Sequence, residues 1–201
     1  MIRTLLSTTA AALAVMPAPT QPALLPGIGP RPAVTKRLWY PADRQPALAL
    51  PDGRRRAIRS LLDVRRPLAF GDFVWNDAGV PAGPAWVRID LAHQTLSVFR
   101  GGHEIGSAVI LYGTDGKPTP TGVFPVLAKA EQHRSSLYDA DMPYMLRLTG
   151  DGVAIHASSV RRGSATHGCI GVPIDFARLL FAVMQRGDPV AILPAAARLT
   201  T

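Results

Sequence analysis

The sequence has little of what most often holds a small exported protein together. It contains a single cysteine, Cys169, so it cannot form an internal disulfide bond. Aromatic residues make up only 6% of its 201 residues, but apolar residues reach 47%. That apolar content is enough for a packed core and excludes a chain that is disordered throughout. The length predicts one sizeable domain with irregular flanks.

The sequence also lacks an apolar run long enough to span a membrane. The apolar run after Arg3 ends near Val15 and is followed by Pro17 and Pro19. It has about 10 to 13 residues, short of the roughly 20 that a spanning helix needs. A charged start with a short apolar run is typical of a cleaved signal peptide. We predict a signal peptide at residues 1–23, export to the periplasm or cell envelope, and no transmembrane anchor. The alternative is an unstructured apolar N-terminus on a cytosolic protein.

Positive charge is unevenly distributed. The formal net charge is +8, from 22 basic and 14 acidic residues. The excess lies between Arg31 and Arg66, whereas residues 86–193 are nearly neutral, so we predict no nucleic-acid partner. Prolines dominate residues 17–52, and apolar residues at helical spacing follow between residues 53 and 64. Residues 24–84 are therefore predicted to be a Pro-rich linker with a short basic helix. This helix either contacts an anionic envelope surface or packs on the domain with a solvated face.

From Trp86 onward the apolar pattern changes to alternation, which predicts β-strands. The expected strands lie at residues 86–91, 95–99, 105–112, 122–128, 144–148, 153–156 and 190–193. One helix is expected at residues 176–186, with Asp175 as its N-cap and Gly187 as its C-cap. The sequence thus predicts a mostly-β, sandwich-like or barrel-like domain over residues 85–194 with one late helix, followed by a tail at residues 195–201.

Two histidines and the only cysteine lie within fourteen residues of one another. Acyl transfer by a thiol needs a thiolate, an imidazole that takes its proton, and backbone N–H groups facing the developing oxyanion. Gly168, directly before Cys169, allows a positive φ and a close approach of the substrate to the backbone. We assign the base to His156, because it arrives on a different strand, whereas His167 is only two residues from Cys169.

These residues resemble the signature of the YkuD-type L,D-transpeptidases. His156, Thr166, His167, Gly168 and Cys169 match it position by position, and the upstream segment 113–124 resembles the family's proline-threonine-glycine strand entry. The resemblance implies a β-sandwich catalytic domain without a cofactor. It also implies that Cys169 is the acyl-enzyme nucleophile and His156 its acid/base partner, and that carbapenems imitate the acyl donor.

The resemblance also implies the substrates. A peptidoglycan stem tetrapeptide would lose its terminal D-alanine while the diaminopimelate carbonyl is held on Cys169. The acyl acceptor would be an amine of another stem peptide or of an envelope protein.

Further site residues follow from the same signature. We expect His167, Gly168, Ala157 and Thr166 to support the nucleophile and the oxyanion. The backbone carbonyl of Ala157, which replaces the family's usual glycine, would orient His156.

Gly171 stands where most members of the family have arginine or asparagine, which predicts a roomier, less charged donor site. Arg161, Arg162 or Arg147 would then supply the missing positive charge. Met142 and Tyr144 are expected to border the groove for the stem peptide.

Other readings of these residues remain open on the sequence alone. A Cys–His hydrolase of the L,D-carboxypeptidase or amidase type needs the same residues and differs only in passing the acyl group to water. A zinc site made by His156, His167 and Cys169 is chemically conceivable, although we predict no metal. A wall-binding module without catalysis, or a buried structural cysteine, gives no role to this combination of residues.

Overall fold

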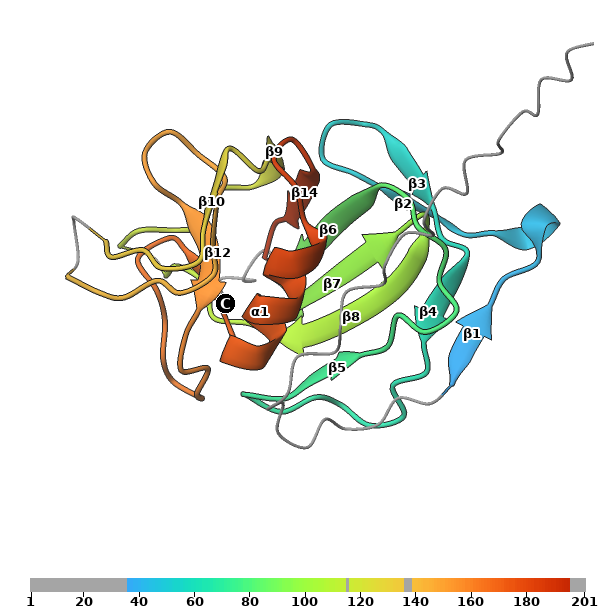
Figure 1. The fold of residues 1–201 in the computed structure, drawn as a ribbon, viewed down its shortest axis with the longest axis horizontal. Helices are drawn as coiled ribbons and strands as arrows, with labels where there is room; N and C mark the ends of the chain where they lie inside the picture. The colour runs from blue at the N-terminus through green and yellow to red at the C-terminus, as the bar shows by residue number, and fades with distance from the viewer. Residues whose placement is uncertain (1–35, 115, 136–138, 196–201) are drawn as a thin grey trace, which may run out of the picture.

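The computed structural model describes residues 36–114, 116–135 and 139–195 (Figure 1). The predicted signal peptide, the first part of the predicted linker and residues 196–201 of the tail lie outside the described residues. Among the residues that are described, no helix is both long and apolar enough to cross a membrane.

The described chain is mostly β with one α-helix, as the sequence predicts. The large sheet has the strand order β1-β4-β8-β7-β6-β14-β9, and β5 also pairs with β8. Its strands are β1 (Arg37–Trp39), β4 (Ser60–Leu62), β5 (Phe73–Trp75), β6 (Ala85–Asp90), β7 (Thr95–Arg100), β8 (His103–Val109), β9 (Gly122–Pro125) and β14 (Pro189–Leu193).

A second sheet of four strands has the order β10-β11-β12-β13. Its strands are β10 (Ala128–Ala130), β11 (Met145–Arg147), β12 (Ala154–Ala157) and β13 (Ile170–Val172). A short hairpin pairs β2 (Ala47–Ala49) with β3 (Arg55–Ala57), and a 3-10 turn, η1, covers Ala42–Arg44. The helix α1 (Ile174–Val183) lies between the second sheet and the large sheet in Figure 1.

Packing around Phe176 explains how α1 joins the two sheets. The fully buried Phe176 ring lies edge-on to Phe73 and Trp75 of β5, with centroid distances of 5.8 and 5.6 Å. Gly106 in β8 makes room for this cluster, because a Cβ there would lie 2.3 Å from the Trp75 ring. Alternating residues of the neighbouring hairpin, such as Val87 and Leu96, fill the same core. The helix is therefore held against β5 while its other side packs on β12.

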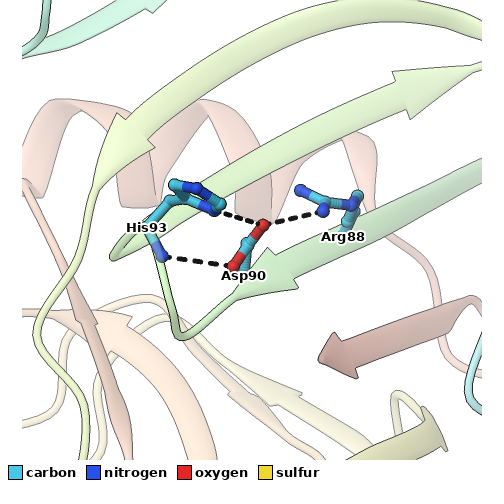
Figure 2. Close-up of polar contacts among 3 residues, drawn as sticks. All are labelled: Arg88, Asp90 and His93. Atoms are coloured by element: carbon cyan, nitrogen blue, oxygen red, sulfur yellow. Dashed lines mark hydrogen bonds and ion pairs between the residues drawn. The ribbon is translucent and has the colours of Figure 1, made fainter. Parts of the chain in front are cut away.

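The β6–β7 hairpin is closed by a buried carboxylate (Figure 2). Asp90 accepts hydrogen bonds from the Arg88 guanidinium at 2.7 Å, from the His93 ring at 2.9 Å and from the His93 backbone N–H at 3.2 Å. Burial alone would raise the pKa of Asp90, but these hydrogen bonds outweigh it and lower the pKa. The charged carboxylate therefore fixes the turn that the sequence places at His93.

The prediction of a helix at residues 53–64 is wrong. Residues 55–57 form β3 and residues 60–62 form β4, which pairs with both β1 and β8. Ile58 and Leu62 are buried, as the apolar spacing suggested, but they are buried by strands. The apolar residues of such a short segment fit either period, and pairing with distant strands decides between them.

Three of the N-terminal strands, β1, β4 and β5, belong to the large sheet, and β2 and β3 pair with each other, so a linker is the wrong description for residues 37–75. Two buried polar contacts fasten β4 to β8. The Glu104 carboxylate accepts the Leu62 N–H at 2.9 Å, and Ser60 Oγ lies 2.9 Å from His103 Nδ1. Arg37 on β1 adds a hydrogen bond to Ser60 at 3.1 Å.

The helix has different ends from those predicted. Pro173 is the N-cap, with an extended backbone and no side-chain capping bond, and Asp175 lies inside the first turn. Met184 is the C-cap, so the helix ends before Gly187. Proline favours a helix start because its fixed φ suits the first turn and its missing N–H would be unpaired there. An acidic side chain in the first turn still complements the helix dipole.

Candidate active site

The pairing of β12 with β13 brings the two candidate catalytic side chains to one face of the second sheet. The strands are parallel, with Ile155 opposite Ile170 and His156 opposite Gly171. Both isoleucines are buried in the main core. Because side chains alternate along a strand, His156 and Cys169, which directly precedes β13, face away from that core. Cys169 packs there against Met142, Met145 and Ala154.

A pocket of about 500 Å³ opens on this face. His156, His167 and Cys169 all line it. The remaining lining residues are Lys117, Ala128, His133, Ser135, Ala140, Met142, Met145, Arg147, Gly150, Asp151, Gly152, Val153 and Thr166.

Cys169 is half-buried and directly precedes β13. Its thiol donates a long hydrogen bond to the Gly152 carbonyl, with 3.9 Å between Sγ and the oxygen. Burial raises the pKa of the Cys169 thiol, because the charged thiolate loses solvation. The raised pKa favours the neutral thiol over the thiolate at neutral pH.

His156 is oriented by the backbone of the next residue. Its Nδ1 lies 2.8 Å from the Ala157 carbonyl, which can only accept, so Nδ1 carries the proton and Nε2 carries the lone pair. Burial lowers the pKa of His156, which keeps the ring neutral. A neutral imidazole with a free Nε2 lone pair is the form that can take a proton from a thiol.

The turn before Cys169 is held by a buried threonine that the sequence analysis did not single out. Thr119 Oγ1 accepts the Gly113 N–H and donates to the Gly168 carbonyl, both at 2.9 Å. Gly168 has a φ of +103°, and a Cβ on Gly113 would lie 2.7 Å from the Gly168 backbone. The position of Thr119 within the proline-threonine segment was the available signal.

Thr166 supports the same turn from the other side. Its hydroxyl donates to the Cys169 carbonyl at 2.5 Å, and its backbone N–H donates to the Tyr112 carbonyl at 3.1 Å. The carbonyls of Gly168 and Cys169 therefore both accept a threonine hydroxyl, which fixes the backbone on each side of the Cys169 side chain. His167 is exposed and lines the pocket.

Most of the residues expected to bind substrate do not line the pocket. Met142 lies in the pocket wall, whereas the Tyr144 ring packs edge-on against Phe181 of α1 at 5.8 Å and does not line the pocket. Arg161 and Arg162 also lie outside the lining, and the Arg162 guanidinium stacks over Phe70. These positions give no support to substrate contacts by Tyr144, Arg161 or Arg162.

Gly171 does not widen the pocket, contrary to the expectation from the sequence. It is buried, and a Cβ there would lie 2.8 Å from Ser158 Cβ and 3.4 Å from Leu111 Cβ. Ser158 therefore fills the space where a larger side chain at position 171 would begin.

The charged residues that do line the pocket include Lys117 and Asp151, which sequence reasoning missed because neither belongs to the cysteine motif.

Three histidine, cysteine, aspartate or glutamate side chains do not come together as metal ligands anywhere in the described ranges. The zinc alternative therefore gains no support from the geometry of His156, His167 and Cys169.

Several known proteins and one family model are similar to this chain. Residues 84–192 match the family model of the L,D-transpeptidase catalytic domain, YkuD. The chain is 25% identical over 133 residues to L,D-transpeptidase 1 of Mycobacterium tuberculosis, a match that covers 57% of this chain and 53% of that protein. The chain thus spans about half the length of the curated relatives it matches.

Solved structures show the same fold. An L,D-transpeptidase from Stackebrandtia nassauensis matches with a TM-score of 0.53 at 24% identity, covering 58% of each chain. An Enterococcus faecium L,D-transpeptidase matches with a TM-score of 0.51 at 25% identity, covering 56% of this chain and 50% of that one.

Proposed function

The chain belongs to the L,D-transpeptidase catalytic domain (YkuD) family, and from that premise we propose that it is a peptidoglycan L,D-transpeptidase using Cys169 as nucleophile and His156 as acid/base partner. The observation that carries the proposal is the parallel register of β12 and β13. It puts both side chains on one face of the sheet and in one pocket.

The resting protonation states define the first step. Nε2 of His156 takes the proton from Cys169 as the sulfur attacks the diaminopimelate carbonyl of a stem tetrapeptide. The carbonyl oxygen becomes an oxyanion, and backbone N–H groups at Gly168 and Cys169 would stabilise it. The positive φ of Gly168 and the two threonine hydroxyls that hold the turn support that role.

The second half of the reaction returns the enzyme to its starting state. The imidazolium gives its proton to the leaving amine, so D-alanine departs and a thioester remains on Cys169. An acceptor amine from another stem peptide or an envelope protein then attacks the thioester, loses a proton to His156 and releases the thiolate, which is reprotonated. The Ala157 carbonyl holds a proton on Nδ1 of His156, so Nε2 is the nitrogen that takes up and gives back the transferred proton.

The proposal includes the compartment. Peptidoglycan lies outside the cytoplasmic membrane, so residues 1–23 would serve as a signal peptide and residues 85–194 would act in the periplasm or cell envelope. N-terminal sequencing of the protein recovered from the envelope fraction tests this. An intact N-terminus in the cytosolic fraction alone would contradict it.

Incubation with purified muropeptides, followed by mass spectrometry, tests the reaction. A cross-linked dimer indicates transpeptidation, a tripeptide indicates hydrolysis to water, and exchange of the terminal D-amino acid gives a third mass. We expect the dimer or the exchange product, and tripeptide alone would favour the Cys–His hydrolase.

Acylation can be followed separately with a carbapenem. The solved structures similar to this chain include an L,D-transpeptidase in complex with imipenem. We expect one imipenem adduct by intact mass on the wild type and none on Cys169→Ala. His156→Ala should slow acylation by about 10²- to 10⁴-fold, the usual contribution of a general acid or base. His167→Ala is the matched control and should have a smaller effect.

A further inference from the structure

Two opposite charges line the pocket that contains Cys169. Lys117 and Asp151 are both exposed, and both line the pocket together with Cys169. They come from different segments, since Lys117 lies in the loop between β8 and β9 and Asp151 lies in the turn between β11 and β12. Lys117 interacts electrostatically with both Cys169 and Asp151, so the three groups are within Coulombic range of one another.

The carboxylate is held in place by its own turn. Thr149 Oγ1 donates to Asp151 at 2.5 Å and accepts the Val153 N–H at 2.9 Å. Arg147, the other strongly basic residue of the lining, donates to the Thr149 and Gly150 carbonyls at 3.0 and 2.5 Å. The Arg147 guanidinium thus stabilises the turn, and Lys117 is the cation of the lining that comes from a different segment and interacts with both Asp151 and the thiol.

Position 171 offers no alternative source of positive charge. Gly171 is buried under Ser158 and Leu111 and does not line the pocket. Arg161 and Arg162 also lie outside the lining. Of the two strongly basic residues that do line the pocket, Arg147 is bonded to the turn that carries Asp151, so we assign a substrate carboxylate to Lys117.

We propose that Lys117 and Asp151 recognise a zwitterionic acyl donor, with Lys117 pairing with a donor carboxylate and Asp151 pairing with a donor ammonium group beside the carbonyl that Cys169 attacks. This inference rests on the proposed function, because it specifies which donor the same pocket selects. The two charges attract each other only weakly in water, but a bound donor displaces water and strengthens the pairing of each with its counter-charge.

A stem tetrapeptide offers these groups in two places. The diaminopimelate side chain ends in an ammonium and a carboxylate, and the terminal D-alanine carries a second carboxylate. Pairing with the diaminopimelate end satisfies both protein charges at once, so we expect that end to be the one recognised. Modifying the donor one group at a time separates the two sources of carboxylate.

The experiment compares four donors with four forms of the full chain. The donors are the unmodified tetrapeptide, its diaminopimelate side-chain carboxamide, its D-alaninamide, and the tetrapeptide with an acetylated side-chain amine. The forms are wild type, Lys117→Met, Asp151→Asn and Lys36→Met, the last replacing an exposed lysine directly before β1. Release of D-alanine or D-alaninamide gives kcat and KM for each combination.

We expect wild type and Lys36→Met to prefer the free diaminopimelate carboxylate over its carboxamide by about 5- to 50-fold in kcat/KM, mainly through KM. Lys117→Met should abolish that preference, and Asp151→Asn should abolish the preference for the free amine over its acetylated form. If Lys117→Met instead abolishes discrimination against the D-alaninamide, the terminal carboxylate is the group recognised, and our assignment to diaminopimelate is wrong.

A uniform effect would overturn the inference. If Lys117→Met lowers kcat/KM equally for all four donors, Lys117 only assists ionisation of the thiol and does not read the donor. Donor preferences that stay unchanged in both Lys117→Met and Asp151→Asn would also overturn the inference. Failure of the wild type to process any donor would instead contradict the proposed function, so the two failures are distinguishable.

Discussion

Cys169 and His156 have pKa values displaced in opposite directions, and burial is the main cause of both shifts. Raising the pKa of a thiol and lowering that of an imidazole both favour the neutral forms. The neutral thiol and the neutral imidazole are therefore the favoured resting forms, and in the proposed mechanism the proton moves from Sγ to Nε2 as the sulfur attacks the substrate carbonyl.

This protonation state predicts the pH dependence. Alkylation of substrate-free Cys169 by iodoacetamide should rise with pH along a curve whose midpoint lies above the roughly 8.5 of a free thiol. The acid limb of kcat/KM should fall below about pH 6.5, because the lowered pKa of His156 keeps the base neutral to a more acidic pH. An alkylation rate that is already at its plateau at pH 7 would indicate a thiolate–imidazolium pair and contradict this assignment.

Sequence alone could single out the candidate reacting side chains but not their surroundings. Cys169 and His156 stand out because a lone thiol, a glycine and two histidines are unusual neighbours. Thr119 and Asp151 are common polar residues, and their roles depend on segments distant in sequence that fold against the motif. The same holds for Ser158, whose contact with Gly171 could not be inferred from spacing.

At the scale of single elements, the Thr119 hydroxyl joins the β8–β9 loop to the turn before β13. Thr119→Val keeps the side-chain shape but leaves a buried N–H and a buried carbonyl without this partner. We expect a loss of about 1–3 kcal/mol in the free energy of unfolding, measured with urea, and slower acylation by imipenem. Thr119→Ser retains the hydroxyl and should lie close to wild type. Equal behaviour of the valine and serine variants would show that the hydroxyl is not needed.

The contact between β13 and the residue after β12 gives a second test. Gly171→Ala places a methyl group 2.8 Å from Ser158 Cβ, so we expect a loss of about 1–3 kcal/mol in the free energy of unfolding from overpacking. Ser158→Gly should restore much of that stability in the double variant, because it vacates the space. Strict additivity of the two substitutions in a double-mutant cycle would mean that Ser158 does not cause the strain.

Strands and the helix can be predicted where the apolar pattern extends over many consecutive residues. The strands β6 and β7 follow from strict alternation, and α1 follows from its apolar spacing after Pro173. The residues of β3 and β4 were assigned to a helix because three-residue strands carry too little periodicity to be distinguished. The caps of α1 differed because Asp175 is a common capping residue but Pro173 already fixes the helix start.

For the molecule as a whole, the N-terminal strands are part of what holds α1. Phe73 and Trp75 of β5 enclose Phe176, and α1 in turn packs on β12, which carries His156. We expect a chain starting at residue 84 to unfold at lower urea concentration than a chain starting at residue 36, and to be acylated more slowly by imipenem. Identical unfolding midpoints for the two chains would show that residues 84–194 fold independently.

The domain boundary was the part of the architecture that sequence could not supply. Prolines and charge made residues 24–84 look like a flanking segment, and the family match also begins at residue 84. Pairing of β4 and β5 with β8 connects residues more than thirty positions apart, and no local pattern encodes such contacts.

The parallel pairing of β12 with β13 has a consequence for a chain that is cut between the two proposed catalytic residues. Parallel strands require a long crossover, here residues 158–169, so backbone hydrogen bonds between the strands set the alignment of His156 with Cys169. The exposed stretch from Arg161 to Ala165 is outside this ladder. Two separately made fragments divided at Gly163 would therefore each carry one residue of the proposed catalytic pair. Acylation of the thiol would then depend on reassembly of the two fragments, as in a split enzyme.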